Sequence, residues 1–322
     1  SAFHLSIAFP HPHCYNKKMK IIPGGTHKME HQTPTPITGH TALICLLGSP
    51  CAHSISPMMH NASFEALGLD YRYLAFDVNE ATLPTAVAGL KVLGARGFNL
   101  TMPDKNLMVS LCDELSTAAR IIGAVNTVVN ENGRLIGHNT DGIGYMQSVK
   151  DAGYDIIGKK MTLLGAGGAA TAILVQAALD GLKEISVFVR PTSRFYDRLV
   201  HTVDELTKIT DCKIKICDFS DAELLKQELA DSAILTNGTS VGMAPHEDTC
   251  PVPEDLVFPD GLIVSDIIYN PRETRLLSMA KHQGNPFFNG SYMLLYQGAE
   301  AFRLWTGKEM PVEQIKREFF SR

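Results

Sequence analysis

The segment from Met161 to Ala170 constrains the fold of this chain more than any other. It runs from MTLL into GAGGAA, and a long apolar stretch follows. A buried strand, a glycine turn and a helix start, in this order, are typical of a dinucleotide site. Gly165 permits the tight turn, Gly167 lets the backbone approach a pyrophosphate, and Ala170 is small enough for close helix–strand packing. The segment therefore predicts that the chain binds NAD or NADP, and it favours an oxidoreductase.

The same segment has an alternative interpretation as a membrane span. No residue from 161 to 179 is charged, and a run of this length is sufficient to cross a bilayer. Three glycines, two threonines and Gln176 interrupt it, however, and no other segment resembles it. We therefore favour the strand, turn and helix.

The composition is that of an ordinary globular enzyme. Of the 322 residues, 45% are hydrophobic and 20% are charged, which suits one large domain or two smaller ones. The net charge is −5 and no Lys/Arg run occurs, which argues against a nucleic acid or an anionic membrane as partner. We expect a cytoplasmic enzyme that acts on a small molecule; a homodimer is compatible with the sequence.

The seven cysteines form no CxxC pair, and their number is odd. Most lie in apolar surroundings, so reduced and buried thiols are favoured over a disulfide framework or a zinc site. The folded part of the chain offers no cluster of Cys, His and Asp, and we expect no metal.

The segment 1–38 differs in kind from the rest, with five prolines, five histidines and no clear periodicity. We expect a disordered or loosely docked extension. Its conceivable metal ligands, whose spacing fits no zinc pattern, are His11, His13, Cys14, His27 and His31. A natural start at Met29 or Met19 is a hypothesis, which the intact mass of the protein from its host would test.

Strand and helix patterns alternate from residue 41 onward. Strands are predicted at 42–48, 71–78 and 97–103, and helices at 58–67 and 81–93; this alternation predicts a parallel sheet with helices on its faces. Short helices follow at 106–111 and 118–122. A hairpin over 126–137 turns at Asn132-Gly133. Further helices are expected at 143–152, 292–306 and 312–320, and further strands at 161–164, 185–189, 214–217, 233–236 and 262–266.

These patterns predict an α/β fold of two domains with the active site in the cleft between them. Residues 39–145 together with 290–322 would form an N-terminal substrate-binding catalytic domain with a mainly parallel sheet. Residues 146–289 would form a Rossmann-like NAD(P)-binding domain.

Polar residues gather where the apolar runs of the first domain end. Open α/β sheets bind ligands at the carboxyl ends of their strands, so these side chains predict a site for a small, polyhydroxylated, anionic substrate. Gln297 is unusual because it interrupts an apolar helix, where a buried amide needs a partner. The residues concerned are Ser54, Ser56, Thr101, Lys105, Asn126, Asp141 and Gln297.

Seven motifs in order give the chain its strongest resemblance. They are HSISP (53–57), NLTMPDK (99–105), GAVNT (123–127), NTDG (139–142), GAGGA (165–169), NGTSVGM (237–243) and YQGAEAF (296–302). With these motifs the chain resembles shikimate dehydrogenases, and within them the quinate/shikimate dehydrogenase branch. The resemblance extends from about Thr41 to Phe320.

The resemblance implies reversible hydride transfer between NAD(P)H and 3-dehydroshikimate, giving shikimate on the route to chorismate and the aromatic amino acids, with quinate as a possible second substrate. It implies that Lys105 and Asp141 are the catalytic pair. The implied substrate-binding residues are Ser54, Ser56, Tyr73, Thr101, Asn126, Tyr269 and Gln297. The implied cofactor-binding residues are Gly165, Ala166, Gly167, Gly168, Ala169, Arg190, Thr192, Ile267 and Gly290.

Each of these residues also has a purely structural interpretation. The two serines suit a helix cap before Pro57, Lys105 and Asp141 suit a surface ion pair, and asparagines are common in turns. Two other functions stay open. One is a catalytically silent sensor of quinate or shikimate, which the intact lysine–aspartate pair disfavours. The other is a methylene-tetrahydrofolate dehydrogenase, which the paired serines disfavour.

The residues after the strand at 185–189 bear on the choice of cofactor. A strict NAD site usually places an acidic residue there to bind the ribose hydroxyls. Here the sequence of residues 189–194 is VRPTSR, and the first acidic residue is Asp197. Arg190 or Arg194 would pair with the 2′-phosphate of NADP. We expect NADP as the cofactor, with NAD as an alternative.

Overall fold

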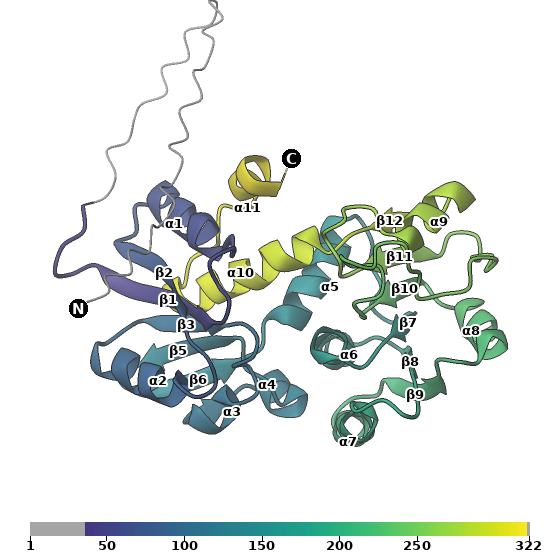
Figure 1. Cartoon of the computed structure of the whole chain (residues 1–322), viewed down its shortest axis with the longest axis horizontal. Coiled ribbons are helices and arrows are strands. Elements are labelled where there is room, and N and C mark those ends of the chain that lie inside the picture. Colours follow the sequence, from purple (N-terminus) through teal and green to yellow (C-terminus); the bar gives the residue numbers. More distant parts are fainter. Residues whose placement is uncertain (1–35, 321–322) are drawn as a thin grey trace, which may run out of the picture. The chain divides into compact units, whose positions relative to one another are not determined.

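The computed structural model describes residues 36–320. The expectations for the N-terminal extension, its histidines and its possible start sites lie outside these residues, apart from 36–38, which have no regular structure. The described chain forms two six-stranded sheets with helices packed on them (Figure 1). The predicted α/β class is therefore confirmed.

The first sheet has the strand order β2-β1-β3-β5-β6-β4. Its first three strands are parallel, and β5 runs antiparallel to β3 and β6. Asn132 and Gly133 have φ values of 54° and 91°, as a two-residue type I′ hairpin requires. The strands are β1 (Ala42–Gly48), β2 (Tyr71–Asp77), β3 (Gly97–Leu100), β4 (Glu114–Leu115), β5 (Thr127–Glu131) and β6 (Arg134–His138).

The helices of this half cover both faces of the sheet. Leu83, Val87 and Leu90 of α2 enter one apolar core with Phe98 of β3, and α1 shares the other core with the C-terminal helices. The helices are α1 (Ser56–Ala66), α2 (Leu83–Val92), α3 (Met108–Leu111), α4 (Thr117–Ile122) and α5 (Asp141–Asp151).

The second sheet is entirely parallel, with the strand order β12-β11-β10-β7-β8-β9. The order reverses at β7, which pairs with β8 on one side and β10 on the other. This is the switch point at which doubly wound sheets bind dinucleotides, and the glycine loop follows β7 directly. The strands are β7 (Lys160–Leu164), β8 (Glu184–Val189), β9 (Lys213–Asp218), β10 (Ile234–Asn237), β11 (Ile263–Asp266) and β12 (Phe287–Phe288).

Helices cover this sheet on both faces, over two separate apolar cores. Helix α6 is apolar on all sides because it lies in the larger core, where most of its residues are buried. The helices are α6 (Gly168–Leu179), α7 (Tyr196–Thr207), α8 (Ala222–Leu229) and α9 (Arg275–Gln283).

The end of the chain returns to the first sheet. Helix α10 (Ser291–Thr306) is followed by α11 (Val312–Ile315) and a π-helical turn, η1 (Lys316–Phe320). Trp305 is fully buried, and its Nε1 donates to the carbonyl of Val128 at 2.9 Å. Gly97 makes room for this ring, because a Cβ atom there would lie 2.3 Å from Trp305 Nε1.

The elements differ from the sequence predictions at a few points. The strand predicted over 97–103 ends at Leu100, because Met102-Pro103 belongs to a turn. The helix expected from residue 143 already begins at Asp141, and the one predicted over 312–320 divides into α11 and η1. The two-residue strands β4 and β12 are too short to show a periodicity.

The alternative of a membrane span at 161–179 does not hold, because these residues form β7, the glycine turn and the twelve-residue α6. In residues 36–320 no helix combines the length and the apolar character that crossing a membrane requires. All six cysteines in that range are free thiols.

Candidate active site

A pocket of about 480 Å³ opens at the carboxyl ends of β1 and β3. Its walls come from the loop before α1, the loop after β3, the start of α5, the loop after β11 and helix α10. Eight of the nine residues predicted to bind or convert the substrate line this pocket; they are Ser54, Ser56, Thr101, Lys105, Asn126, Asp141, Tyr269 and Gln297.

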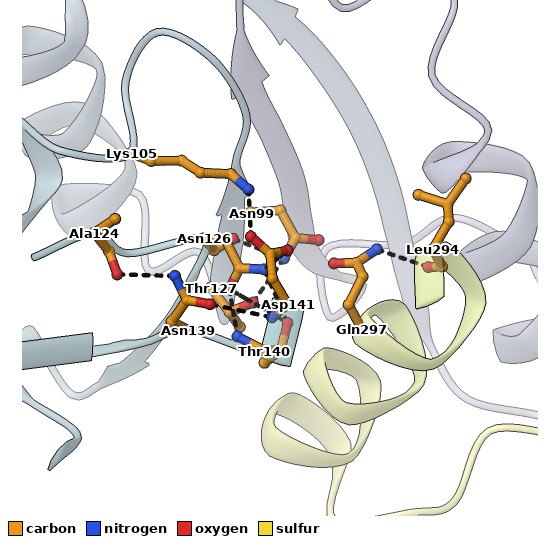
Figure 2. A network of polar contacts seen from close by, with 10 residues as sticks. All are labelled: Asn99, Lys105, Ala124, Asn126, Thr127, Asn139, Thr140, Asp141, Leu294 and Gln297. Atoms are coloured by element: carbon orange, nitrogen blue, oxygen red, sulfur yellow. Dashed lines mark hydrogen bonds and ion pairs between the residues drawn. The ribbon is translucent and has the colours of Figure 1, made fainter. Parts of the chain in front are cut away.

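Lys105 and Asp141 form an ion pair inside the pocket. Lys105 Nζ lies 2.7 Å from Asp141 Oδ2, and the side chains are only 22% and 17% exposed (Figure 2). This is not the solvated surface pair of the alternative interpretation. Asp141 is the first residue of α5, where a carboxylate is stabilised by the positive end of the helix dipole.

Asn126 holds the other oxygen of this carboxylate. Its Nδ2 donates to Asp141 Oδ1 at 2.8 Å and to Thr140 Oγ1 at 3.0 Å, and its Oδ1 accepts the backbone N–H of Thr140 at 2.8 Å. Asn139 is the turn residue of the motif: its Oδ1 accepts the N–H of Asp141, and its Nδ2 donates to the carbonyl of Ala124 (Figure 2). Each carboxylate oxygen of Asp141 therefore has a fixed donor.

Asn99 is a pocket residue that sequence reasoning did not single out. Its Nδ2 donates to the carbonyl of Asn126 and to Thr127 Oγ1, both at 3.0 Å. Its Oδ1 accepts the hydroxyl of Tyr73 at 2.7 Å. The motif NLTMPDK contains Asn99, so its place beside Thr101 was the available signal.

Tyr73 requires a correction. It was expected to contact the substrate, but its side chain is 0% exposed and does not belong to the pocket lining. Burial raises the pKa of its phenol well above the usual range, so the hydroxyl keeps its proton and donates to Asn99. Tyr73 supports the pocket from behind, through its bond to Asn99.

The paired serines stand at the start of α1. Ser54 Oγ accepts the backbone N–H of Ser56 at 3.2 Å, and the N-cap residue of the helix, Ile55, makes no side-chain cap bond. Both serines line the pocket. Their position is compatible with ligand binding as well as with a structural role at the helix start.

Gln297 enters the pocket from α10. Its Nε2 donates to the carbonyl of Leu294 at 2.9 Å (Figure 2), which supplies the partner that an amide on an apolar helix needs. Gly290, just before α10, also lines the pocket. A Cβ atom at Gly290 would lie 1.9 Å from the carbonyl oxygen of Ile267, so only glycine fits here.

A second pocket, of about 990 Å³, lies over the glycine loop. Gly165 has φ +100°, which only glycine adopts readily. Cβ atoms at Gly167 and Gly168 would meet nothing within 4 Å, so the loop borders open space at the N-terminus of α6. Ala169, Ile267 and Tyr269 line both pockets, which therefore adjoin.

Arginines gather at the far end of the second pocket, after β8. Arg190 lines it, as does Phe195, and the guanidinium carbons of Arg194 and Arg198 lie 4.7 and 5.1 Å from the centre of the Phe195 ring. Arg198 Nη2 donates to the carbonyl of Ala166 at 3.4 Å. Phe195 and Arg198 were not predicted, because nothing in the sequence places α7 beside the glycine loop.

Thr192, between the lining residues Arg190 and Ser193, does not itself line the second pocket. It was expected to contact the cofactor, but it is exposed and lies outside the lining of this pocket. Residues 191 and 192 form a turn. Ser193, the next residue, lines the pocket in its place.

A buried carboxylate orders the remaining wall of the second pocket. Asp266 accepts hydrogen bonds from Asn237 Nδ2, Thr274 Oγ1 and the N–H of Ile268. Burial raises the pKa of Asp266 to about 6. Asn237 Oδ1 in turn accepts from Thr239, which faces the glycine loop. The loops after β10 and β11 are thereby tied together.

The second pocket fits a dinucleotide. The open space at Gly167 and Gly168 leaves room for a pyrophosphate, and it lies at the start of α6, where a helix has free N–H groups. Arginine side chains stand where an adenosine ribose phosphate would be bound. Among residues 36–320, no three or more His, Cys, Asp or Glu side chains gather in a way that could hold a metal.

Two family models match the chain. The model of the shikimate dehydrogenase substrate binding domain matches residues 46–128, and that of the shikimate 5′-dehydrogenase C-terminal domain matches residues 290–318. The first match covers the loops with Ser54, Lys105 and Asn126, and the second begins at Gly290.

Full-length relatives are also similar to this chain. The shikimate dehydrogenase (NADP(+)) of Listeria monocytogenes is 52% identical over 293 residues, which are 91% of this chain and 100% of the relative. The quinate/shikimate dehydrogenase of Escherichia coli is 44% identical over 281 residues, which are 87% and 97% of the two chains. The crystal structure of the Listeria monocytogenes shikimate 5-dehydrogenase in complex with shikimate and NAD matches with a TM-score of 0.84 at 52% identity, covering 88% of this chain and 98% of that one. On this sequence and structural similarity, the chain belongs to the shikimate dehydrogenase family.

Proposed function

We propose that this enzyme catalyses the reversible NAD(P)-dependent reduction of 3-dehydroshikimate to shikimate. The observation that carries the proposal is the ion pair of Lys105 and Asp141, at 2.7 Å, in a pocket that adjoins the glycine-loop pocket. A proton donor and a hydride carrier must meet at one carbon–oxygen bond, and the adjoining pockets give each of them a place.

Lys105 supplies the proton side of the reaction. Ketone reduction places a growing negative charge on the substrate oxygen, which a cationic donor stabilises in the transition state. Lys105 Nζ would donate to that oxygen and transfer its proton as the alcohol forms. A bound nicotinamide would supply the hydride to the ring carbon, and would accept it in the reverse direction.

Asp141 keeps Lys105 in position and shares the proton. Its Oδ2 accepts from Lys105 Nζ, while Asn126 holds its Oδ1 at 2.8 Å, so the carboxylate cannot rotate away. Two such groups titrate jointly. In the oxidation direction the pair accepts the proton of the substrate hydroxyl.

The remaining pocket residues would recognise the substrate. Ser54 and Ser56 would bind its carboxylate, and Thr101, Asn126 and Gln297 its ring hydroxyls. Tyr269 lines both pockets and would stand where substrate and cofactor meet. We assign these roles to a substrate domain of residues 39–145 and 290–322 and a cofactor domain of residues 146–289.

We propose NADP as the preferred cofactor, with NAD accepted. Arg190 lines the second pocket, and no acidic side chain does, which favours a 2′-phosphate over free ribose hydroxyls. The relatives fit a mixed preference, because one is named for NADP(+) and a solved relative contains NAD. Quinate as a second substrate has the support of the Escherichia coli relative's name.

Steady-state assays of shikimate and quinate, each with NADP⁺ and NAD⁺, test the proposal through kcat/KM. We expect the highest value for shikimate with NADP⁺. Tight binding of shikimate without turnover would favour the silent sensor. Turnover of methylene-tetrahydrofolate in place of shikimate would favour the other alternative. The cytoplasmic location and the homodimer remain predictions.

A further inference from the structure

The substrate pocket contains a second cation besides Lys105. Arg272, in the loop after β11, lines the same pocket. Lys105 is balanced by Asp141, but the described part of the chain places no carboxylate within ion-pair distance of Arg272. Its Nη2 donates to a neutral partner, the carbonyl of Phe320, at 3.4 Å. The positive charge of Arg272 is therefore available to a ligand.

The backbone of Arg272 is anchored to the start of α10. Asn289 Nδ2 donates to the carbonyl of Arg272 at 2.8 Å, and Asn289 Oδ1 accepts the N–H of Ser291 at 3.0 Å. Gly290 and Ser291 line the pocket beside it. The backbone of Arg272 is thus anchored beside the pocket, while its side chain is exposed and reaches the carbonyl of Phe320.

Its partner Phe320 lines the same pocket as the two serines. Phe320 ends η1, which continues α11, and α11 packs against α1 (Figure 1). Helix α1 begins at Ser56, so its positive dipole end and the two serines border the pocket that Arg272 also lines. The carboxylate of Asp141 is at the reaction centre, where it would repel a second carboxylate.

We propose that Arg272 binds the carboxylate of the substrate together with Ser54 and Ser56, and so selects anionic substrates. This inference rests on the proposed function. Two hydroxyls alone give a carboxylate only neutral donors, whereas removing it from water requires a charged partner. The guanidinium has five N–H groups, and its bond to Phe320 uses one nitrogen.

The experiment compares an acid with its uncharged ester. The dissociation constants of shikimate and methyl shikimate are measured by titration calorimetry in the presence of NADPH, which cannot accept a hydride, so that no turnover occurs during the titration. The wild type should bind the acid at least about tenfold more tightly than the ester, as a charge-assisted hydrogen bond provides. In Arg272→Met this ratio should fall about tenfold, through weaker binding of the acid alone, and Arg272→Lys should lie in between.

Arg275→Met is the matched control. Arg275 is exposed, pairs with Glu254 at 2.6 Å and does not line the substrate pocket, so its loss should leave the ratio unchanged. Arg272→Gln provides a second neutral variant should the methionine variant fold poorly.

The outcomes separate the two proposals. An acid-to-ester ratio that stays at the wild-type value in Arg272→Met or Arg272→Gln overturns the role of Arg272. Binding of shikimate to the wild type without turnover overturns the proposed reaction but leaves the role of Arg272 standing. A wild type that binds neither compound overturns both.

Discussion

Gly144 on α5 lies so close to the backbone of Gln297 on α10 that a side chain cannot be placed between them. A Cβ atom at Gly144 would be 2.6 Å from the amide nitrogen of Gln297 and 2.7 Å from the carbonyl oxygen of Met293. Two residues earlier, a Cβ atom at Gly142 would be 2.3 Å from the carbonyl oxygen of Ala172 on α6. Helix α5 therefore contacts the helix that carries Gln297 and the helix that follows the glycine loop, and it begins with Asp141.

Gly144→Ala should destabilise the protein by about 2 kcal/mol, because the new methyl group meets backbone atoms that can move only with the whole of α10. It should also raise the KM for shikimate, since Gln297 moves with its helix. Urea denaturation and steady-state kinetics measure the two effects.

Gly89→Ala is the control for this change. Gly89 is also inside a helix, α2, but a Cβ atom there would meet nothing within 4 Å. Alanine should stabilise that helix by about 0.5 to 1 kcal/mol and leave KM unchanged. A Gly144→Ala protein as stable as the wild type would show that α5 and α10 can separate at no cost.

Lys105→Met should lower kcat by about two to four orders of magnitude, the usual contribution of a positioned proton donor. The dissociation constant of NADP⁺ should change little, because Lys105 lines only the substrate pocket. Rapid-mixing kinetics and cofactor titration measure the two quantities.

Lys91→Met gives the corresponding loss of a paired lysine at the surface. Lys91 lies 3.2 Å from Asp113, and both side chains are exposed, so kcat should not change. Near-normal turnover in Lys105→Met would remove Lys105 from the mechanism.

The sequence predicts those parts of the site that depend on local patterns. The glycine loop after β7 and the polar residues after β1 and β3 are visible because strand, turn and helix leave periodic and compositional signals within a few residues. The placement of Asp141 beside Lys105 required the resemblance to a family, since the two residues are 36 positions apart.

The remaining residues depend on contacts between distant elements. Arg198 meets the glycine loop only because α7 packs beside α6, and Arg272 meets its partner Phe320 only because η1 returns to the substrate pocket. Tyr73 is the opposite case, a residue that was predicted at the site but is buried behind it. The resemblance implied a contact with the substrate, but the Tyr73 side chain lies behind Asn99 and bonds to it. The sequence of its strand contains no signal that distinguishes a side chain behind the pocket from one inside it.

Arg190→Ser should raise the KM for NADP⁺ by about tenfold or more and leave the KM for NAD⁺ within about twofold, because the guanidinium would contact only the 2′-phosphate. Steady-state kinetics with both cofactors measure the change. Arg134→Ser is the control, since Arg134 is exposed on the β5–β6 hairpin and pairs with Glu114 of β4. A wild type with a large preference for NAD⁺ would contradict this role of the arginine.

His60 is a buried imidazole without a hydrogen-bond partner among the described residues. Its side chain is 0% exposed, and neither ring nitrogen makes a hydrogen bond. It stacks on Tyr73 at 4.5 Å and lies among the rings of Phe64, Phe302 and Trp305. Burial lowers the pKa of His60 from 6.5 to about 3.

This shift makes stability depend on pH with a definite sign. Below pH 6.5 the unfolded chain binds a proton at His60, whereas the folded chain binds it only near pH 3. The free energy of unfolding therefore decreases as the pH falls through this window. Between pH 7 and pH 5 this group lowers the free energy of unfolding by about 2 kcal/mol.

His60→Phe should remove this contribution, so urea denaturation at the two pH values should show a smaller decrease in stability for the variant. His282→Gln, at an exposed position on α9, should retain the wild-type decrease. An equal decrease in His60→Phe would mean that the folded protein accommodates the charged ring.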